Sequence, residues 1–411
     1  MIMIKNNFIL LLAVVSISFV GFGQQKNLDT YFASNSLVNH LVQVNITPTQ
    51  ETSTPHWMYF LANEAGHTFT ASGNFMSLIH ARDPNYIPLE NMWFSDFDSI
   101  PSGWDSFGTP SLGQSPIDNI VITPYNFVQP SQPSPTDTYG FMDTTLSPVI
   151  AIDTFVNYVR SESPDMPIYI YEGWNEMDAY TNGVFPPTPP QFTNWINSTR
   201  FGTTYHDWFI ELHDSAVSNH PNDCVKMIPV GPIIAELLDR PPYNTMVADS
   251  IFEDTAPHGR PSIYFLAGMI SYMAIYEEPA PLSYVPPSEF IDPVIVSNYQ
   301  NLVHEIWTEL LAFNFDNGTS RVFCNPPASS IKKKEPLYAF KVFPNPSNTV
   351  LNIQTDLPEG KFQLRDIRGN VVSETSIHTP INVQQFARGY YFLELYDLQN
   401  QSMGIQKVII Q

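Results

Sequence analysis

The feature that most constrains the fold is the alternation of short apolar runs with helical stretches through the middle of the chain. Each apolar run has the length of a buried strand and ends at a polar residue, a glycine or a proline. The stretches between the runs repeat apolar residues at helical spacing. The predicted strands are 30–33, 119–123, 167–171 and 225–230, and the predicted helices are 148–161, 203–219 and 293–313. This alternation favours an α/β/α domain around a parallel sheet of about five strands.

A parallel sheet of this kind also predicts where a functional site lies. Ligands bind in such folds beyond the carboxyl ends of the strands, where the loops emerge. Four places fall just past a predicted strand end, and these are Ser36, Tyr125, the segment 172–176 and Gly231.

The N-terminus has the pattern of a secretory signal peptide. Lys5 precedes an apolar run over 8–20, and small residues follow before Gln24, which predicts a signal peptide over 1–23. The apolar run is short for a transmembrane helix, and no later segment has the pattern of a membrane span. The main domain is expected over 25–325, followed by a linker over 326–337 that holds three prolines and three lysines.

The last part of the chain, 338–411, has the pattern of a small antiparallel sandwich. Short alternating strands are expected at 350–353, 361–364, 390–395 and 407–410, with glycine-containing turns between them. The most distinctive motifs are Pro344-Asn345-Pro346, Asp366-Ile367-Arg368-Gly369, Gly389-Tyr390-Tyr391 and Lys407-Val408-Ile409-Ile410.

These motifs closely resemble the type A C-terminal sorting domain of the type IX secretion system. The resemblance implies contact with the type IX secretion machinery and passage through the outer membrane of a Bacteroidota-type bacterium. Release from the cell or attachment at its surface would follow. A generic carbohydrate-binding sandwich is the alternative.

Charge and cysteine content exclude several classes of function. The net charge is −22, from 18 basic and 40 acidic residues, which argues against binding of nucleic acid or of an anionic membrane. The sequence has no glycine-rich phosphate loop and no Cys/His spacing typical of zinc sites, so we expect neither a cofactor nor a metal. Cys224 and Cys324 are the two cysteines, and either one disulfide or two buried thiols fits the sequence.

An acid and a histidine late in the main domain give the strongest chemical signal. Asp254 precedes His258 by four residues, directly before an apolar helical run over 263–276. An acid shortly before a histidine is a common way to hold a catalytic imidazole, because the acid orients the ring and stabilises its imidazolium form. Ser36, in a turn after the first predicted strand, is the candidate nucleophile. Each feature alone also fits a chance pairing or an ordinary turn serine.

In this order the residues resemble the SGNH hydrolase superfamily, whose members are esterases and deacetylases with a three-layer α/β/α fold. Ser34-Asn35-Ser36-Leu37 stands where that family has its nucleophile turn, although Ser34 replaces the usual glycine. The resemblance implies that Ser36 is the nucleophile and His258 the general base. It also implies a carboxylic ester hydrolase, and for a secreted member an acylated carbohydrate as substrate.

The resemblance further implies an oxyanion hole. The segment 68–74 corresponds to the second family block and offers the backbone N–H of Gly73. The third block corresponds to Trp174-Asn175-Glu176 and offers the side chain of Asn175. Together with the backbone N–H of Ser36, these groups would stabilise the developing oxyanion.

The acid departs from the family pattern, since the family spacing places it three residues before the histidine, at Thr255. Asp254 lies one residue earlier. A local bulge around Pro257 would bring Asp254 to the imidazole. A bridging water, or a Ser-His dyad without an acid, would also account for the departure.

Two other functions fit parts of the sequence. Asn175-Glu176 after a strand resembles the acid/base motif of the large (β/α)8 glycosidase clan, with Glu176 as the acid and Glu236 as a candidate nucleophile. A non-catalytic surface carbohydrate-binding protein is the third possibility. Exposed aromatic side chains stack on sugar rings, and Trp93-Phe94 and Trp104 are the candidates.

Overall fold

The computed structural model describes residues 25–40, 52–75, 78, 112–124, 134–139, 144–325, 340–355, 357, 359–366, 371–377, 379–396 and 402–411. The chain divides into two compact units, which are described separately. The first covers Met1–Phe315 and Ser320–Pro327, and the second covers Asp316–Thr319 and Ala328–Gln411. Several predictions fall outside the described residues, namely those on the signal peptide 1–23, the linker 326–337, Tyr125, Trp93, Phe94 and Trp104.

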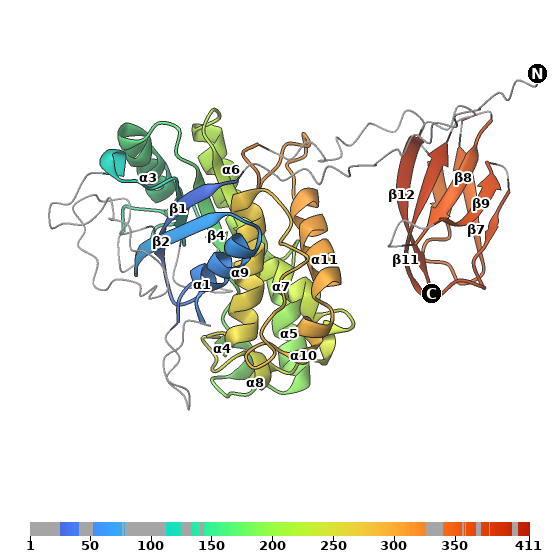
Figure 1. The fold of residues 1–411 in the computed structure, drawn as a ribbon, viewed down its shortest axis with the longest axis horizontal. Helices are drawn as coiled ribbons and strands as arrows, with labels where there is room; N and C mark the ends of the chain where they lie inside the picture. The colour runs from blue at the N-terminus through green and yellow to red at the C-terminus, as the bar shows by residue number, and fades with distance from the viewer. Residues whose placement is uncertain are drawn as a thin grey trace, which may run out of the picture. The chain divides into compact units, whose positions relative to one another are not determined.

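The first unit is built around a parallel sheet of five strands (Figure 1). In chain order the strands are β1 (Asn27–Ser34), β2 (Thr68–Phe75), β3 (Asn119–Ile122), β4 (Ile168–Glu172) and β5 (Val225–Pro229). Their order across the sheet is β2-β1-β3-β4-β5, and every neighbouring pair is parallel. The predicted α/β class and parallel sheet are therefore confirmed.

Alternate residues along β1, β3, β4 and β5 belong to two separate cores, one on each face of the sheet. On β4, Tyr169 and Tyr171 face one core, whereas Ile168 and Ile170 face the other. This follows from the pleat, which sends successive side chains to opposite faces of a strand. Both faces are covered by helices, so the sheet carries buried apolar side chains on both of its faces.

The helices differ in which face of the sheet they cover. Helices α3 and α6 pack on one core, and α1, α5, α7, α9 and α11 pack on the other. The bounds are α1 (Thr54–Glu64), α3 (Pro148–Glu162), α4 (Asp178–Thr181), α5 (Pro189–Thr199), α6 (Thr204–Asn219), α7 (Val230–Leu238), α8 (Ala248–Ile251), α9 (Pro261–Tyr276), α10 (Pro293–Ser297) and α11 (Tyr299–Ala312). The described residues of this unit also form two 3₁₀ turns, η2 (Leu112–Gln114) and η3 (Tyr243–Thr245).

Helix α9 is the central helix of its layer and packs along α1 (Figure 1). Its residues from Ser262 to Tyr276 are all buried, which explains why the sequence shows a nearly continuous apolar run there instead of one apolar stripe. The helix begins with Pro261, a residue suited to a first turn because it lacks the N–H that would have no partner there. The segment predicted as one helix over 293–313 is instead two helices that meet at Asn298.

A disulfide joins Cys224 to Cys324 and decides between the two possibilities left open by the sequence. The bond links the residue before β5 to the last described segment of this unit, over a sequence separation of 100. The Glu277 side chain holds the same segment by accepting hydrogen bonds from the backbone N–H of Cys324, at 2.7 Å, and of Asn325, at 3.0 Å.

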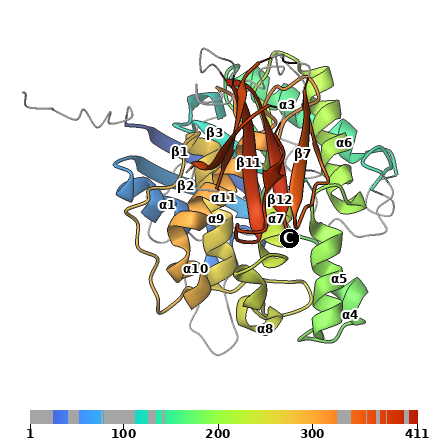
Figure 2. The same cartoon turned by 90° about the vertical axis from the view of Figure 1, so that its right-hand side faces the viewer.

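The second unit consists of antiparallel strands in two sheets, as the alternating pattern predicts (Figure 2). One sheet has the order β10-β7-β6 and the other β12-β11-β8-β9, and the apolar side chains of both form one core. The bounds are β6 (Phe340–Phe343), β7 (Val350–Thr355), β8 (Lys361–Arg365), β9 (Val371–Ser376), β10 (Ile381–Asn382), β11 (Gly389–Tyr396) and β12 (Ser402–Ile410).

Among the described residues, no helix combines the length and the apolar character that crossing a bilayer requires.

Candidate active site

The turn that carries Ser36, the predicted nucleophile, begins two residues after β1 ends. The Asn35 side chain shapes the turn by accepting a hydrogen bond from the backbone N–H of Leu37 at 3.0 Å, and the Asn35 backbone carbonyl accepts from Val38 N–H at 3.0 Å. Strand β1 lies between β2 and β3, so the chain leaves its carboxyl end where the strand order reverses direction. A crevice for a ligand forms at such a position, and Ser36 is half-buried there.

Two tyrosine hydroxyls fix the backbone of this turn by donating hydrogen bonds to its carbonyl groups. Tyr171 on β4 donates to the carbonyl oxygen of Leu37 at 3.2 Å, and Tyr264 on α9 donates to the carbonyl oxygen of Ser36 at 2.5 Å. Both tyrosines are fully buried. The serine is therefore held on a rigid support, which suits a group that must keep one position.

The histidine lies in a short closed loop before α9. An antiparallel bridge between Phe252 and Gly259 closes the loop, and Glu253 N–H donates to the carbonyl of His258 at 2.9 Å. Inside the loop, Asp254 Oδ1 accepts hydrogen bonds from the backbone N–H groups of Ala256 and His258, both at 3.0 Å. The aspartate thus folds the loop that carries the histidine.

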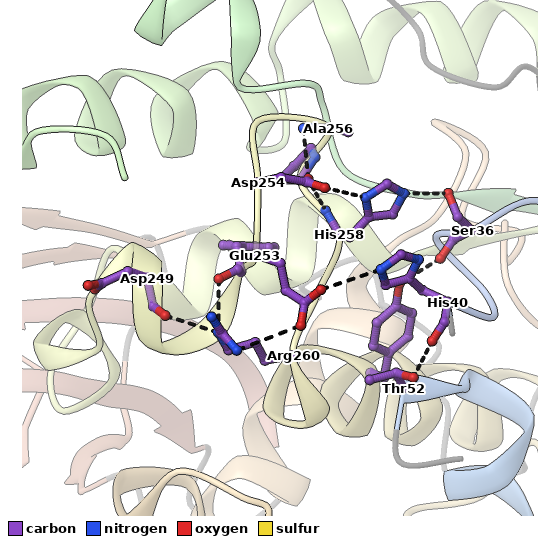
Figure 3. Close-up of polar contacts among 12 residues, drawn as sticks. Ser36, His40, Thr52, Asp249, Glu253, Asp254, Ala256, His258 and Arg260 are labelled. Atoms are coloured by element: carbon purple, nitrogen blue, oxygen red, sulfur yellow. Dashed lines mark hydrogen bonds and ion pairs between the residues drawn. The ribbon is translucent and has the colours of Figure 1, made fainter. Parts of the chain in front are cut away.

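Within this loop the four-residue spacing brings the acid onto the ring. Asp254 Oδ2 lies 2.7 Å from His258 Nδ1, and His258 Nε2 lies 2.9 Å from Ser36 Oγ (Figure 3). The structure therefore brings together the three residues predicted as nucleophile, base and acid. In place of the predicted bulge the structure has a short loop, which is tightened by the hydrogen bonds that the Asp254 side chain accepts from backbone N–H groups.

The electrostatics of the pair fix the tautomer of the imidazole. Burial raises the pKa of Asp254, but hydrogen bonds from the ring and the backbone N–H of His258 outweigh it, so the pKa of this carboxyl lies below its usual value. An ionised carboxylate only accepts hydrogen bonds, so the proton lies on Nδ1 of His258. The lone pair of Nε2 is then free to accept the hydroxyl proton of Ser36.

The segment after β4 joins the serine turn to the histidine loop. Trp174 Nε1 donates to the carbonyl of Pro257 at 2.8 Å, and Met177 N–H donates to the carbonyl of Thr255 at 2.9 Å. On the other side, a side chain at Gly173 would place its Cβ 2.7 Å from Leu37 Cδ1. A side chain at 173 would therefore require the Leu37 side chain to shift, and the serine turn and the histidine loop both lie against the segment after β4.

Asn175 follows directly on this segment, but its side chain is not joined to Ser36. Its amide nitrogen lies 3.3 Å from the hydroxyl of Tyr180 and 3.5 Å from that of Ser198. Its side-chain oxygen is buried and, among the described residues, has no hydrogen-bond partner. The role of Asn175 as an oxyanion donor stays a prediction, supported by its place beside the joined segments.

Gly73 lies inside β2, opposite Phe32 on β1. A Cβ at this position would be 2.3 Å from the carbonyl oxygen of Phe32, so the glycine is needed for the close approach of the two strands. Phe32 lies within β1, whereas Ser36 lies in the turn after the end of that strand. No contact joins Gly73 to Ser36, so its predicted part in an oxyanion hole gains no support from this position.

A second histidine, His40, lies beside His258 and was not identified from the sequence. His40 stacks face to face on His258, with ring centroids 3.9 Å apart and an angle of 10° between the planes. Its Nε2 lies 3.5 Å from Oε2 of Glu253, which in turn pairs with Arg260 at 3.6 Å. The sequence offers one signal for a role of His40, namely its position four residues after the predicted nucleophile Ser36.

The two carboxylates of the glycosidase hypothesis occupy unrelated settings. Glu236 lies on α7, and its carboxylate accepts hydrogen bonds from Nε and Nη2 of Arg200, at 2.9 and 3.1 Å. Glu176 is half-buried after β4. The open order of the five-stranded sheet also differs from a closed (β/α)8 barrel, so the architectural argument for a glycosidase falls away.

Comparison with family models matches residues 341–411 to the secretion system C-terminal sorting domain. No curated protein matches the chain. The matched domain indicates export across the outer membrane, to secretion or to the cell surface, and implies interaction with the type IX secretion machinery. The match lies within the second unit. Any function of the first unit must therefore be argued from the residues of that unit.

Proposed function

We propose that the first unit is a serine ester hydrolase that removes acyl groups from a carbohydrate or polysaccharide outside the cell. One observation carries the proposal, namely the continuous hydrogen-bond chain from Ser36 through His258 to Asp254. Serine is a weak nucleophile until a neighbouring base removes its proton. The chain supplies that base, with a carboxylate to orient it.

In the proposed reaction, Ser36 Oγ attacks the ester carbonyl while His258 Nε2 takes the hydroxyl proton. Asp254 stabilises the imidazolium without taking the proton itself. The imidazolium then gives the proton to the leaving alcohol, and an acyl-enzyme remains on Ser36. Water deprotonated by His258 attacks this acyl group, the imidazolium returns the proton to Ser36 Oγ as the Ser36–acyl bond breaks, and the acid is released.

The negative charge on the carbonyl oxygen needs donors in the transition state. The backbone N–H of Ser36 is the first candidate, because it lies in the turn itself, and the Asn175 amide is the second. Removal of one donor typically costs about 3 kcal/mol of transition-state stabilisation. An Asn175→Ala variant that loses that amount would support the amide as a donor.

The substrate class rests on location and on the resemblance in the nucleophile and histidine segments. A protein exported across the outer membrane meets extracellular polymers, and esters on sugar hydroxyls are the acyl groups that such a hydrolase would find there. The acyl group and the sugar are open to a direct screen of acetylated oligosaccharides by release of free acid.

The proposal is tested with a fluorophosphonate probe and with p-nitrophenyl acetate. We expect the probe to label Ser36, as read by peptide mass spectrometry. Ser36→Ala and His258→Ala should each lower kcat by about 10³-fold or more with folding intact. Matched controls are Ser161→Ala on α3 and His304→Ala on α11, both exposed positions, which should hydrolyse at the wild-type rate.

Two results would contradict the proposal. Undiminished turnover in Ser36→Ala would remove this serine from the chemistry. A wild-type protein that neither reacts with the probe nor hydrolyses any ester would favour a binding protein without catalysis.

A further inference from the structure

The side chain that covers His258 belongs to His40, and the surrounding contacts hold it there. Its backbone N–H donates to the carbonyl of Thr52 at 3.0 Å, and the Thr52 hydroxyl donates back to the carbonyl of His40. The backbone of His40 is thereby fixed to that of Thr52, and its imidazole ring lies face to face with that of His258, as Figure 3 shows.

Four charged or titratable groups surround the His40 ring. His258 lies on its face, with Asp254 beyond it, and Glu253 lies at its edge, with Arg260 beyond that. Burial is the main cause that lowers the pKa of His40, to about 4, with a further lowering by His258 and an opposing effect of Asp254. The ring is therefore neutral over the pH range in which an esterase with a histidine base works.

We propose that His40 is a positioning residue for the triad, whose neutral ring fixes the plane of the His258 imidazole and stabilises the imidazolium formed during acyl transfer. This inference rests on the proposed hydrolase function. Rotation of the His258 ring would break both of its hydrogen bonds, and a ring stacked at 3.9 Å opposes that rotation. The face of an aromatic ring also attracts a cation within about 6 Å of its centre.

Glu253 and Arg260 complete the arrangement behind His40. The Glu253 side chain is 4% exposed, and burial raises the pKa of its carboxyl while Arg260 opposes that rise. The carboxylate approaches Nε2 of His40 and no atom of His258 at hydrogen-bond distance. Its contact with the triad is therefore indirect, through the stacked ring.

The test compares two substitutions that remove the same polar contacts but differ in the ring. His40→Phe keeps an aromatic face against His258, whereas His40→Leu has an aliphatic side chain of similar size. Both variants lack the ring nitrogen that lies near Glu253, so the loss of that interaction is the same in the two variants and cancels in the comparison. We expect His40→Phe to retain kcat for p-nitrophenyl acetate within about threefold, and His40→Leu to lose roughly tenfold with KM unchanged.

The pH–rate profile gives a readout that a purely structural role would not move. The acid limb of kcat/KM reports the pKa of the free base. Because an aromatic face favours the imidazolium, this pKa should be about half a unit higher in His40→Phe than in His40→Leu. Thermal unfolding of the two variants serves as the folding control.

The outcomes separate this inference from the function on which it rests. Equal kcat and equal acid limbs in the two variants would overturn the role of the ring, while labelling of Ser36 in the same proteins would leave the hydrolase in place. Wild-type activity in His40→Leu would do the same. A wild-type protein without a reactive Ser36 would overturn both.

Discussion

The two side-chain oxygens of Asp254 have different partners and therefore different tasks. Oδ1 accepts from two backbone N–H groups and folds the loop, whereas Oδ2 accepts from the ring of His258. A single side chain thus determines both the position of the imidazole and its tautomer. A substitution that keeps one oxygen and replaces the other separates the two tasks.

Asp254→Asn is that substitution, and we expect it to lower kcat by about 10²- to 10⁴-fold with little effect on folding. The amide oxygen can still accept from the backbone, but the amide N–H₂ cannot accept from Nδ1 and favours the wrong tautomer. Asp249→Asn, on the exposed side of α8, is the matched control and should behave as wild type. Glu253→Gln should cost less than Asp254→Asn. A kcat and pH–rate profile of Asp254→Asn equal to wild type would show that the acid is not Asp254.

His213 provides a pH-dependent contribution to stability away from the site. The ring is fully buried, with Nε2 bonded to the carbonyl of Val225 at 3.0 Å and Nδ1 accepting from Arg321 at 3.1 Å. Burial is the main cause that lowers its pKa from 6.5 to about 4. Between these values the unfolded chain binds a proton that the folded protein does not, so stability is lost as the pH falls from about 6.5 towards 4.

We expect this histidine to remove about 2 kcal/mol of stability between pH 7 and pH 5. His213→Gln should flatten the dependence of the unfolding free energy on pH over that range, whatever its effect at pH 7. His304→Gln, on the exposed face of α11, is the control and should leave the slope unchanged. Urea denaturation at several pH values measures both, and equal slopes in the two variants would refute the assignment.

At the scale of elements, the sequence predicted those strands that are apolar on both faces. The four apolar runs predicted as strands in the main domain correspond to β1, β3, β4 and β5. They were recognisable because parallel strands buried on both faces have nearly continuous apolar sequences. Strand β2 was not recognised as a strand. Its sequence, TFTASGNF, is rich in small polar residues, and it lies at the edge of the sheet with one described neighbour. Strand β5 also lies at an edge but keeps an apolar run, whereas the small polar residues of β2 interrupt that pattern, so local sequence alone did not reveal β2.

The residues of the candidate site that lie in short sequence motifs could be predicted, whereas those that depend on the tertiary structure could not. Ser36, His258 and Asp254 were identified because each lies at a strand end or before a helix, in a recognisable short motif. The stacking of His40 depends on how two distant segments meet, which no local pattern encodes. The position of Gly73 depends on the register of β2 against β1, which is likewise a tertiary property.

At the scale of the whole molecule, the disulfide is the main covalent constraint on the first unit. We expect the double variant Cys224→Ser/Cys324→Ser to lose about 3–5 kcal/mol of unfolding free energy, because the bond closes a loop of 100 residues in the unfolded chain. Urea denaturation measures the loss. Wild-type protein unfolded in the presence of a reductant should match the variant, and a variant as stable as the oxidised wild type would contradict the expectation.

The same bond decides how a pulling force would pass through the molecule. Tension applied to the chain beyond Cys324 is transferred across the disulfide to Cys224, beside β5, without loading the residues between them. A length of about 340 Å of extended chain is thereby kept out of reach of stretching. His258 lies within this protected ring and Ser36 lies outside it. A protein exported by its C-terminal domain can thus be held at that end while the loop that carries its imidazole bears no load.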